Sequence, residues 1–334
     1  MSGGKIFRKF LIFLCLAALM LTGCTSAKTE EAAQQETDGK EENGEKKIQI
    51  GLTVDSFVIE RWIRDRDVFV ATARDLGAEV NVQDAGADAQ EQISQIDYFI
   101  KKHMDVIVII ARDCGALSEA VERAHSSGIR VISYDRMVND ANTDMYISFD
   151  NRMVGEIMAQ SMEEAIPDGG KIFMIQGSAT DNNVAMVKEG FEDTLQGSNL
   201  QVVYEANCEG WTAELAVDYV EEALEEYPDV KGIFATNETV ADLVVNVLDS
   251  MDKTTGEDRI KVVSFDGGED QMKLLEDGKI DGLIVQNPYG IGYATVVACA
   301  RAVLGQGNEA TVSTGYTWVT KDNMNKDSIK KMLY

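Results

Sequence analysis

The chain alternates short apolar segments with longer amphipathic ones, and this alternation constrains its fold more than any other feature. Residues 106–111 are entirely apolar and rich in β-branched side chains, which is typical of a strand buried on both faces. In the first half the strand-like runs are 48–54, 80–83, 106–111, 129–134 and 144–149, and the helix-like runs are 62–76, 90–102 and 117–126. Strands that alternate with helices indicate βαβ units and a parallel sheet.

The same alternation starts again after a break near Asp150. Its strand-like runs are 171–176, 201–204, 233–236, 261–265 and 282–286, and its helix-like runs are 154–164, 185–195, 212–226, 239–252, 271–276 and 292–304. A chain of 334 residues is long enough for two domains of ordinary size. We therefore expect an α/β fold with two similar lobes and a ligand cleft between them.

The N-terminal residues 1–23 have the features of a bacterial lipoprotein signal peptide. A basic segment precedes an apolar run at 10–21 that is short for a membrane span. Leu21-Thr-Gly-Cys24 resembles a lipobox, which implies cleavage before Cys24 and lipidation of that residue; an uncleaved membrane anchor is the alternative. Residues 24–46 have no apolar period and are expected to form a flexible tether. Either way, we expect the folded part outside the cytoplasmic membrane and attached to its outer face.

The formal charge of −26 argues against two kinds of partner. A chain this acidic should repel nucleic acid and anionic membrane surfaces. The sequence has no Cys-x-x-Cys pair and only two histidines, which argues against a zinc site, a disulfide framework and Ser/His catalysis. The segment Asp140-x-Asn142-x-Asp144 begins like a calcium loop, but Met145 stands where that loop needs glycine. We expect no metal and no cofactor.

Polar and aromatic residues follow the strand-like runs. Asp135 and Arg136 come directly after 129–134, at the edge where an open α/β sheet presents side chains to a ligand. An acid beside a planar guanidinium supplies acceptors and donors that suit a small polyhydroxylated molecule. The alternative is a local ion pair between these two residues that holds a loop.

Similar residues stand at the ends of other strands in both halves. They are Arg61, Trp62, Asn183, Trp211, Asn237, Asp266 and Gln286. Carboxylates, amides and guanidiniums bind vicinal hydroxyls, and two indoles can stack on the C–H faces of a pyranose, so the set matches a sugar. Each residue also has a structural alternative, because a helical Trp often lies in a core and an Asn or Asp after a strand often caps a helix. Glu60, Arg64 and Asp65 are expected to be solvated charges on a helix face.

Several motifs resemble the type I periplasmic sugar-binding family, above all its xylose-binding branch. They are Ile50-Gly-Leu-Thr-Val-Asp55, Glu60-Arg-Trp-Ile-Arg-Asp-Arg-Asp67, Gln92-Ile-Ser-Gln-Ile96, Ile132-Ser-Tyr-Asp-Arg-Met137, Tyr146-Ile-Ser-Phe-Asp-Asn151 and Asp181-Asn-Asn183. The resemblance extends from about residue 47 to 304. It implies two Rossmann-like lobes, with parallel sheets flanked by helices, joined by a three-stranded hinge and closing over one monosaccharide. The implied lobes are 47–150 plus about 288–312, and 151–287 plus about 313–334.

The resemblance also implies roles for individual residues. Arg61 and Trp62 match an Arg-Trp pair that contacts and stacks on the sugar, and Asp135-Arg136 match an Asp-Arg pair. In the second lobe, the implied ligands are the amide of Asn183, the opposing aromatic Trp211, and the polar residues Asn237 and Asp266. Gln286 resembles the ribose-binding branch, because the chain lacks the Lys that precedes Pro288 in the xylose-binding branch. D-Xylose is the first expectation, and glucose, ribose or another aldose remain open.

We therefore expect a monomeric lipoprotein that captures a monosaccharide without catalysis and delivers it to an ABC transporter. A sensor that presents the sugar to a membrane kinase is the alternative, since both functions use closure driven by the ligand. A glycosidase would need Asp135 and Asp266 as paired carboxylates, but Arg136 should hold Asp135 ionised. A sugar-responsive repressor would carry a DNA-binding segment where the signal peptide stands.

Overall fold

The structure is a computed structural model that describes residues 47–306 and 311–333. The predicted signal peptide, the lipidation site at Cys24 and the predicted tether at 24–46 all lie outside the described residues.

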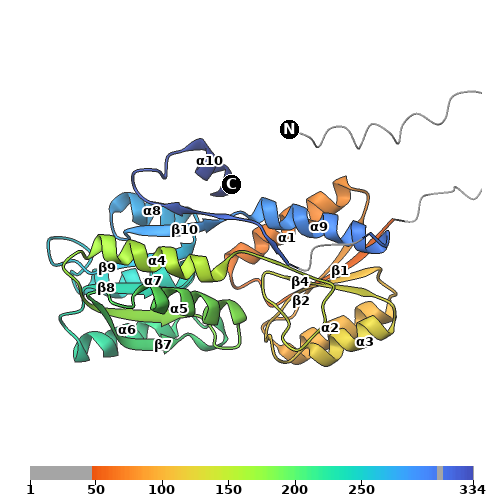
Figure 1. Cartoon of the computed structure of the whole chain (residues 1–334), viewed down its shortest axis with the longest axis horizontal. Helices are drawn as coiled ribbons and strands as arrows, with labels where there is room; N and C mark the ends of the chain where they lie inside the picture. The colour runs from red at the N-terminus through yellow and green to blue at the C-terminus, as the bar shows by residue number, and fades with distance from the viewer. Residues whose placement is uncertain (1–46, 307–310, 334) are drawn as a thin grey trace, which may run out of the picture. The chain divides into compact units, whose positions relative to one another are not determined.

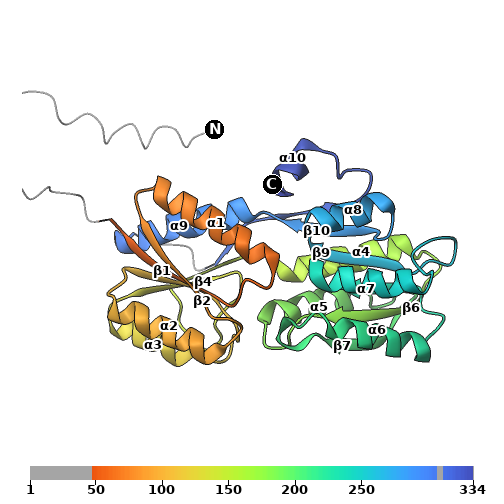
Figure 2. The same cartoon turned by 180° about the vertical axis from the view of Figure 1, so that it is seen from behind.

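The first sheet has six strands in the order β11-β5-β4-β3-β1-β2, and all neighbours are parallel. The strands are β1 (Gln49–Val54), β2 (Glu79–Asp84), β3 (Val106–Ile110), β4 (Arg130–Tyr134), β5 (Met145–Ser148) and β11 (Thr311–Ser313). Its helices are α1 (Glu60–Asp75), α2 (Ala89–Lys101), α3 (Ser118–Ser126) and α9 (Pro288–Val303). One apolar core lies under α1 and α9 and another under α2 and α3, so helices cover both faces (Figure 2). We call this sheet and its helices the first lobe.

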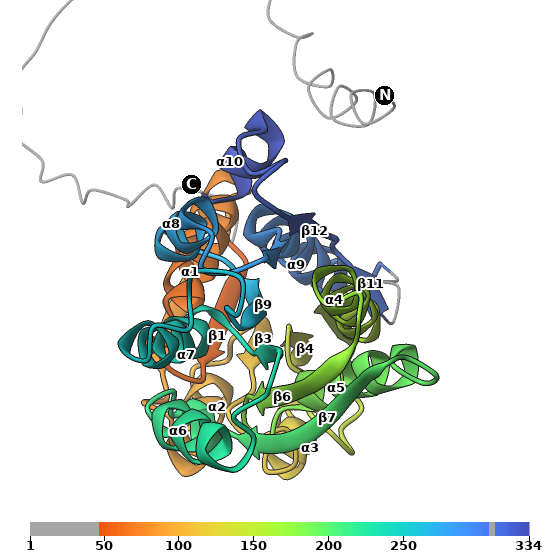
Figure 3. The ribbon, with the colours of Figure 1, turned by 90° about the vertical axis from the view of Figure 1, so that its left-hand side faces the viewer.

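The second sheet also has six strands, in the order β12-β10-β9-β8-β6-β7. The strands are β6 (Gly170–Gln176), β7 (Leu200–Asn207), β8 (Gly232–Ala235), β9 (Lys261–Asp266), β10 (Gly282–Gln286) and β12 (Tyr316–Val319). Its helices are α4 (Asn151–Ala165), α5 (Asn182–Thr194), α6 (Leu215–Glu226), α7 (Glu238–Ser250), α8 (Glu269–Asp277) and α10 (Asp327–Leu333). Helices α4 and α5 cover one face, and α6, α7 and α8 cover the other (Figure 3). These elements form the second lobe.

The chain passes between the lobes at three places. The crossings lie between β5 and α4, between β10 and α9, and between β11 and β12. In Figure 1, helices α4 to α8 accompany the second sheet, while α1, α2, α3 and α9 accompany the first. The prediction of two α/β lobes built on mainly parallel sheets flanked by helices is confirmed.

Three details differ from the sequence pattern. Strand β12 is antiparallel to β10, so the second sheet is not entirely parallel. The helix expected over 212–226 begins at Leu215, because a short 3-10 turn, Glu209–Trp211, precedes it and contains Gly210 in the left-handed region (φ 62°). The pattern of residues did not predict β11, β12 or α10, since the two strands have only three and four residues and each lies at a sheet edge.

Candidate ligand-binding site

All nine predicted site residues line one cavity between the lobes. Its empty space, opening included, is about 390 Å3. The first lobe contributes Ile59, Arg61, Trp62, Asp135 and Arg136, and the second contributes Asn151, Asp181, Asn183, Val184, Val187, Trp211, Asn237, Phe265, Asp266 and Gln286. Parallel strands bring their carboxyl ends to one edge of a sheet, which explains why residues far apart in the chain meet here.

Arg61 lies in the first turn of α1 and joins carboxylates from both lobes. Its guanidinium forms an ion pair with Asp135, and its Nη1 lies 3.5 Å from Oδ1 of Asp266. Its Nη2 also lies 3.5 Å from Oδ2 of Asp65, four residues along the helix. Arg61 is 6% exposed, so these charges meet away from bulk water. Two carboxylates that share one guanidinium are poorly suited to act as a glycosidase acid pair.

The expectation that Asp65 is a solvated charge on a helix face is wrong. The sequence places it in a run of charges that should be solvated, yet it is 1% exposed and accepts a hydrogen bond of 3.0 Å from the Tyr134 hydroxyl. Burial raises the pKa of Asp65 to about 6 even though Arg61 opposes the shift. Arg64 is half-buried, and the side chain of Glu60 is outside the described side chains.

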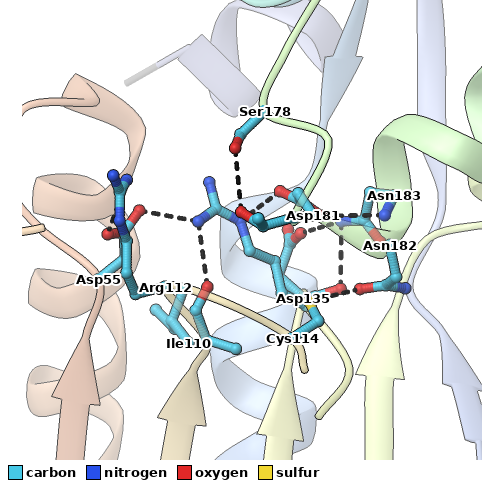
Figure 4. Close-up of polar contacts among 12 residues, drawn as sticks. Asp55, Ile110, Arg112, Cys114, Asp135, Ser178, Asp181, Asn182 and Asn183 are labelled. Atoms are coloured by element: carbon cyan, nitrogen blue, oxygen red, sulfur yellow. Dashed lines mark hydrogen bonds and ion pairs between the residues drawn. The ribbon is translucent and has the colours of Figure 1, made fainter. Parts of the chain in front are cut away.

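Arg136 is fully buried and does not pair with its neighbour Asp135. Its Nη1 donates to Oδ2 of Asp55 at 2.8 Å and to the carbonyl of Ala111 at 3.1 Å. Its Nε lies 2.6 Å from Oδ2 of Asp181, which belongs to the second lobe. The alternative of a local Asp135–Arg136 ion pair is therefore wrong. Asp55 and Asp181 appear on either side of this network in Figure 4.

The neighbouring amides of Asn182 and Asn183 reach from α5 to the first lobe (Figure 4). Nδ2 of Asn183 donates to Oδ1 of Asp135 at 2.7 Å. Oδ1 of Asn182 accepts from the backbone N–H of Met137 at 2.9 Å and from the thiol of Cys114 at 3.3 Å. Asn182 does not line the cavity, so its bonds hold the lobes together beside it.

Two indoles line the cavity, one from each lobe. The ring centroids of Trp62 and Trp211 each lie 5.2 Å from the guanidinium carbon of Arg136. Each indole N–H is buried without an acceptor among the described residues, so each is available to a ligand. Trp211 packs against Gly177, where an added Cβ would lie 2.3 Å from the ring. Glycine is therefore required at that position for the ring to lie as it does.

The second lobe supplies further acceptors. Asn237 caps α7, because its Oδ1 accepts a hydrogen bond from the N–H of Val240 at 3.0 Å. The alternative role of helix cap is therefore correct for Asn237, although the residue also lines the cavity. Oε1 of Gln286 and Oδ1 of Asp266 are buried and receive no hydrogen bond within the described residues. Buried polar atoms normally have partners, so these oxygens indicate a ligand that donates hydrogen bonds.

Three of the nine predicted residues have left-handed backbone conformations. The φ angles are 62° at Asp135, 58° at Trp211 and 78° at Asp266. Such conformations are costly for residues other than glycine, and they concentrate at functional sites. The fold thus holds these three side chains in place at some cost in stability.

The cavity suits a small neutral ligand with many hydroxyl groups. Two arginines and three aspartates line it, so the charges nearly balance. Four apolar residues, Ile59, Val184, Val187 and Phe265, complete the wall beside the indoles. Sequence reasoning did not assign a ligand role to Asn151 or Asp181, although both stand in motifs that carried the family resemblance. The described part of the chain contains no group of three or more His, Cys, Asp or Glu placed to hold a metal ion.

Comparison with known proteins identifies the family. Residues 50–307 match the periplasmic binding protein domain. The chain is 32% identical to the D-xylose-binding periplasmic protein of Escherichia coli (strain K12), covering 93% of this chain and 94% of that protein. This chain belongs to the type I periplasmic sugar-binding family.

Two further members are similar. The D-xylose-binding periplasmic protein of Haemophilus influenzae is 38% identical over 61% of this chain and 62% of its own length. A carbohydrate transporter solute-binding protein from Agrobacterium radiobacter, solved in complex with D-arabinose, superposes with a TM-score of 0.80 at 25% identity, covering 87% of this chain and 100% of its own. Type I periplasmic sugar-binding proteins bind their ligands without converting them, so this chain is not an enzyme, as predicted.

Proposed function

We propose that this chain captures a neutral monosaccharide outside the cytoplasmic membrane and delivers it to an ABC transporter. The observation that carries the proposal is the convergence of nine polar and aromatic side chains from both lobes on one cavity. The cavity's unbonded donors and acceptors match a ligand that carries several hydroxyl groups.

D-Xylose is our first candidate for the ligand. Two relatives are named for it, and together they match most of this chain. A structural neighbour holds D-arabinose, another aldopentose, so the same fold accommodates related sugars. The near balance of charge in the cavity argues against sugar phosphates and sugar acids.

Binding would act through closure of the lobes. The lobes proposed to move are 47–150 with 288–312, and 151–287 with 313–334. Arg136 and Asp181 approach each other from opposite lobes, and so do Asp135 and Asn183. A ligand that contacts both lobes binds the closed form more tightly and shifts the population toward it. A transporter would then recognise the closed surface.

We further propose that Cys24 is lipidated and tethers the folded part to the membrane through residues 24–46. Within the described residues, none of the helices combines the length and apolarity that crossing a bilayer requires. Mass spectrometry of protein purified from the membrane fraction tests the anchor, which predicts a diacylated or triacylated N-terminal Cys24. A Cys24→Ser variant should appear in the soluble fraction.

Titration calorimetry tests the ligand on protein truncated at Cys24. We expect D-xylose to bind in the micromolar range or tighter, with glucose, ribose, galactose and D-arabinose as comparisons. Trp211→Ala should weaken binding at least about tenfold, because it removes a stacking face and an indole N–H donor. Absence of binding to all five sugars would refute the proposed ligand class. A separate experiment addresses the partner: co-purification with a permease or with a sensor kinase would distinguish the two possibilities.

A further inference from the structure

Glu238 is a buried carboxyl to which sequence reasoning assigned no role. It is the first residue of α7, directly after Asn237, and it is 5% exposed. Strands β8 and β9 are parallel neighbours, with Phe234 beside Val263. The carboxyl ends of these strands therefore lie side by side, which brings Glu238 close to Asp266, itself only 8% exposed.

Two neighbouring carboxyls can bond to each other only if one of them carries a proton. Among the described residues, neither oxygen of Glu238 receives a hydrogen bond from a donor group, and Oδ1 of Asp266 receives none either. An ionised Glu238 would thus be a buried charge beside a second buried charge, which is strongly unfavourable.

The surrounding charges decide which carboxyl keeps the proton. Burial also raises the pKa of Asp266; Arg61, 3.5 Å away, opposes that shift and favours the ionised form, whereas Asp135 adds to it. Arg64 attracts both carboxylates. From α8, Gln271 donates to the backbone carbonyl of Glu238 at 2.9 Å rather than to its carboxyl, and also donates to Asp242 of α7. Burial first, and then the Asp266 carboxylate, raise the pKa of Glu238 to about 8.

We propose that Glu238 is a positioning residue, protonated at neutral pH, whose hydroxyl donates to Asp266 and fixes that carboxylate as the acceptor for a ligand hydroxyl. This inference rests on the proposed function, since Asp266 lines the cavity assigned to the sugar. Loss of the proton would place two like charges side by side and turn Asp266 away from the ligand. Binding should therefore weaken in alkaline solution.

Calorimetric titration with D-xylose from pH 6.5 to 9 tests this role in three proteins. The wild-type Kd should rise about tenfold by pH 9, because only the protonated fraction binds well. Glu238→Gln supplies a permanent N–H donor, so its Kd should stay within about threefold of wild type at pH 6.5 and remain level to pH 9. Glu238→Ala should weaken binding about tenfold at pH 6.5. Asp249→Asn, at the far end of α7, is the control and should keep the wild-type pH profile.

Two outcomes would overturn the role of Glu238. Glu238→Gln could follow the wild-type pH profile, which would place the titrating group elsewhere, or it could bind as weakly as Glu238→Ala at pH 6.5. If D-xylose binds none of the proteins, the proposed ligand fails, and the proton is tested without ligand. Carbon-13 NMR of glutamate-labelled protein should then show one carboxyl resonance with a midpoint near pH 8 that Glu238→Gln lacks. Absence of that resonance would also refute the inference.

Discussion

Arg136 of the first lobe and Asp181 of the second form an ion pair of 2.6 Å, and each side chain is 2% exposed. Arg136 keeps a second carboxylate, Asp55, within its own lobe at 2.8 Å. The pair with Asp181 is therefore the part of this network that separation of the lobes would break, while Arg136 itself would stay neutralised.

Asp181→Asn should accelerate ligand release. Asparagine preserves the α5 cap, since its side-chain oxygen can still accept from the N–H of Asn183, but it removes the charge that faces Arg136. We expect the dissociation rate to rise about tenfold with a smaller change in the association rate. Stopped-flow fluorescence with D-xylose measures both rates. The matched control is Asp229→Asn, which removes an exposed partner of Lys171 in the same lobe and should change neither rate. An unchanged dissociation rate in Asp181→Asn would mean that the pair does not hold the closed form.

The rate at which the Cys114 thiol reacts should depend on whether the two lobes are closed. This thiol donates to Asn182 and the N–H of Cys114 donates to the carbonyl of Thr180, both across the lobe boundary. Burial raises the pKa of this thiol to about 12, so little thiolate is present in the closed form. Saturating D-xylose should slow labelling of Cys114 by a disulfide reagent at least about tenfold, because only opened molecules react.

Cys208 and Cys299 supply the internal controls for this labelling. Cys208 lies in the apolar core of the second lobe and Cys299 in the apolar core of the first. Neither thiol should be labelled, with or without sugar. Peptide mass spectrometry identifies which thiol reacts. Equal labelling of Cys114 in both conditions would count against closure driven by the ligand.

At position 266, glycine should give a more stable protein than alanine, which is the reverse of the usual order. The φ of 78° at Asp266 is unfavourable for alanine and neutral for glycine, and both substitutions remove the carboxylate. We expect Asp266→Gly to unfold with a free energy about 1 kcal/mol greater than that of Asp266→Ala, and both variants to lose sugar binding. Urea denaturation gives the comparison. Ser264, inside the same strand, should show the ordinary order, with alanine more stable than glycine.

Asp65 should make stability depend on pH. Its pKa is raised to about 6 in the fold, so the folded state binds more protons than the unfolded state between about pH 4 and 6. The stabilisation is complete below the unfolded pKa and is lost as pH rises through the folded one. The free energy of unfolding should fall by up to about 1 kcal/mol per pH unit in that window relative to Asp65→Asn.

Urea titrations of the ligand-free protein at several pH values measure this slope. Asp67→Asn removes an exposed carboxylate from the same helix and should retain the wild-type slope. If Asp65→Asn also retains it, the proton is bound elsewhere.

The fold and the cavity were predictable because both follow from periodicity and strand ends. Every strand-like run of the sequence corresponds to a strand, and the polar residues after those runs meet at the two sheet edges. The burial of Asp65 was not predictable, because a charged residue four positions after Arg61 has the same pattern on a solvated face. Glu238 follows Asn237 at a helix start, a position where acidic residues are common for local reasons. Only the tertiary neighbour, Asp266, distinguishes it.

Helix α9 and strand β11 belong to the first lobe, although they lie near the end of the chain. Until residues 288–313 have been synthesised, the core that Ile291, Val296 and Cys299 help to close lacks its covering helix, and β5 lacks an edge partner. The first lobe thus cannot complete its fold until the chain has been made through β11. An incomplete lobe can still thread through an export channel, so this order of synthesis would help to postpone folding to the far side of the membrane.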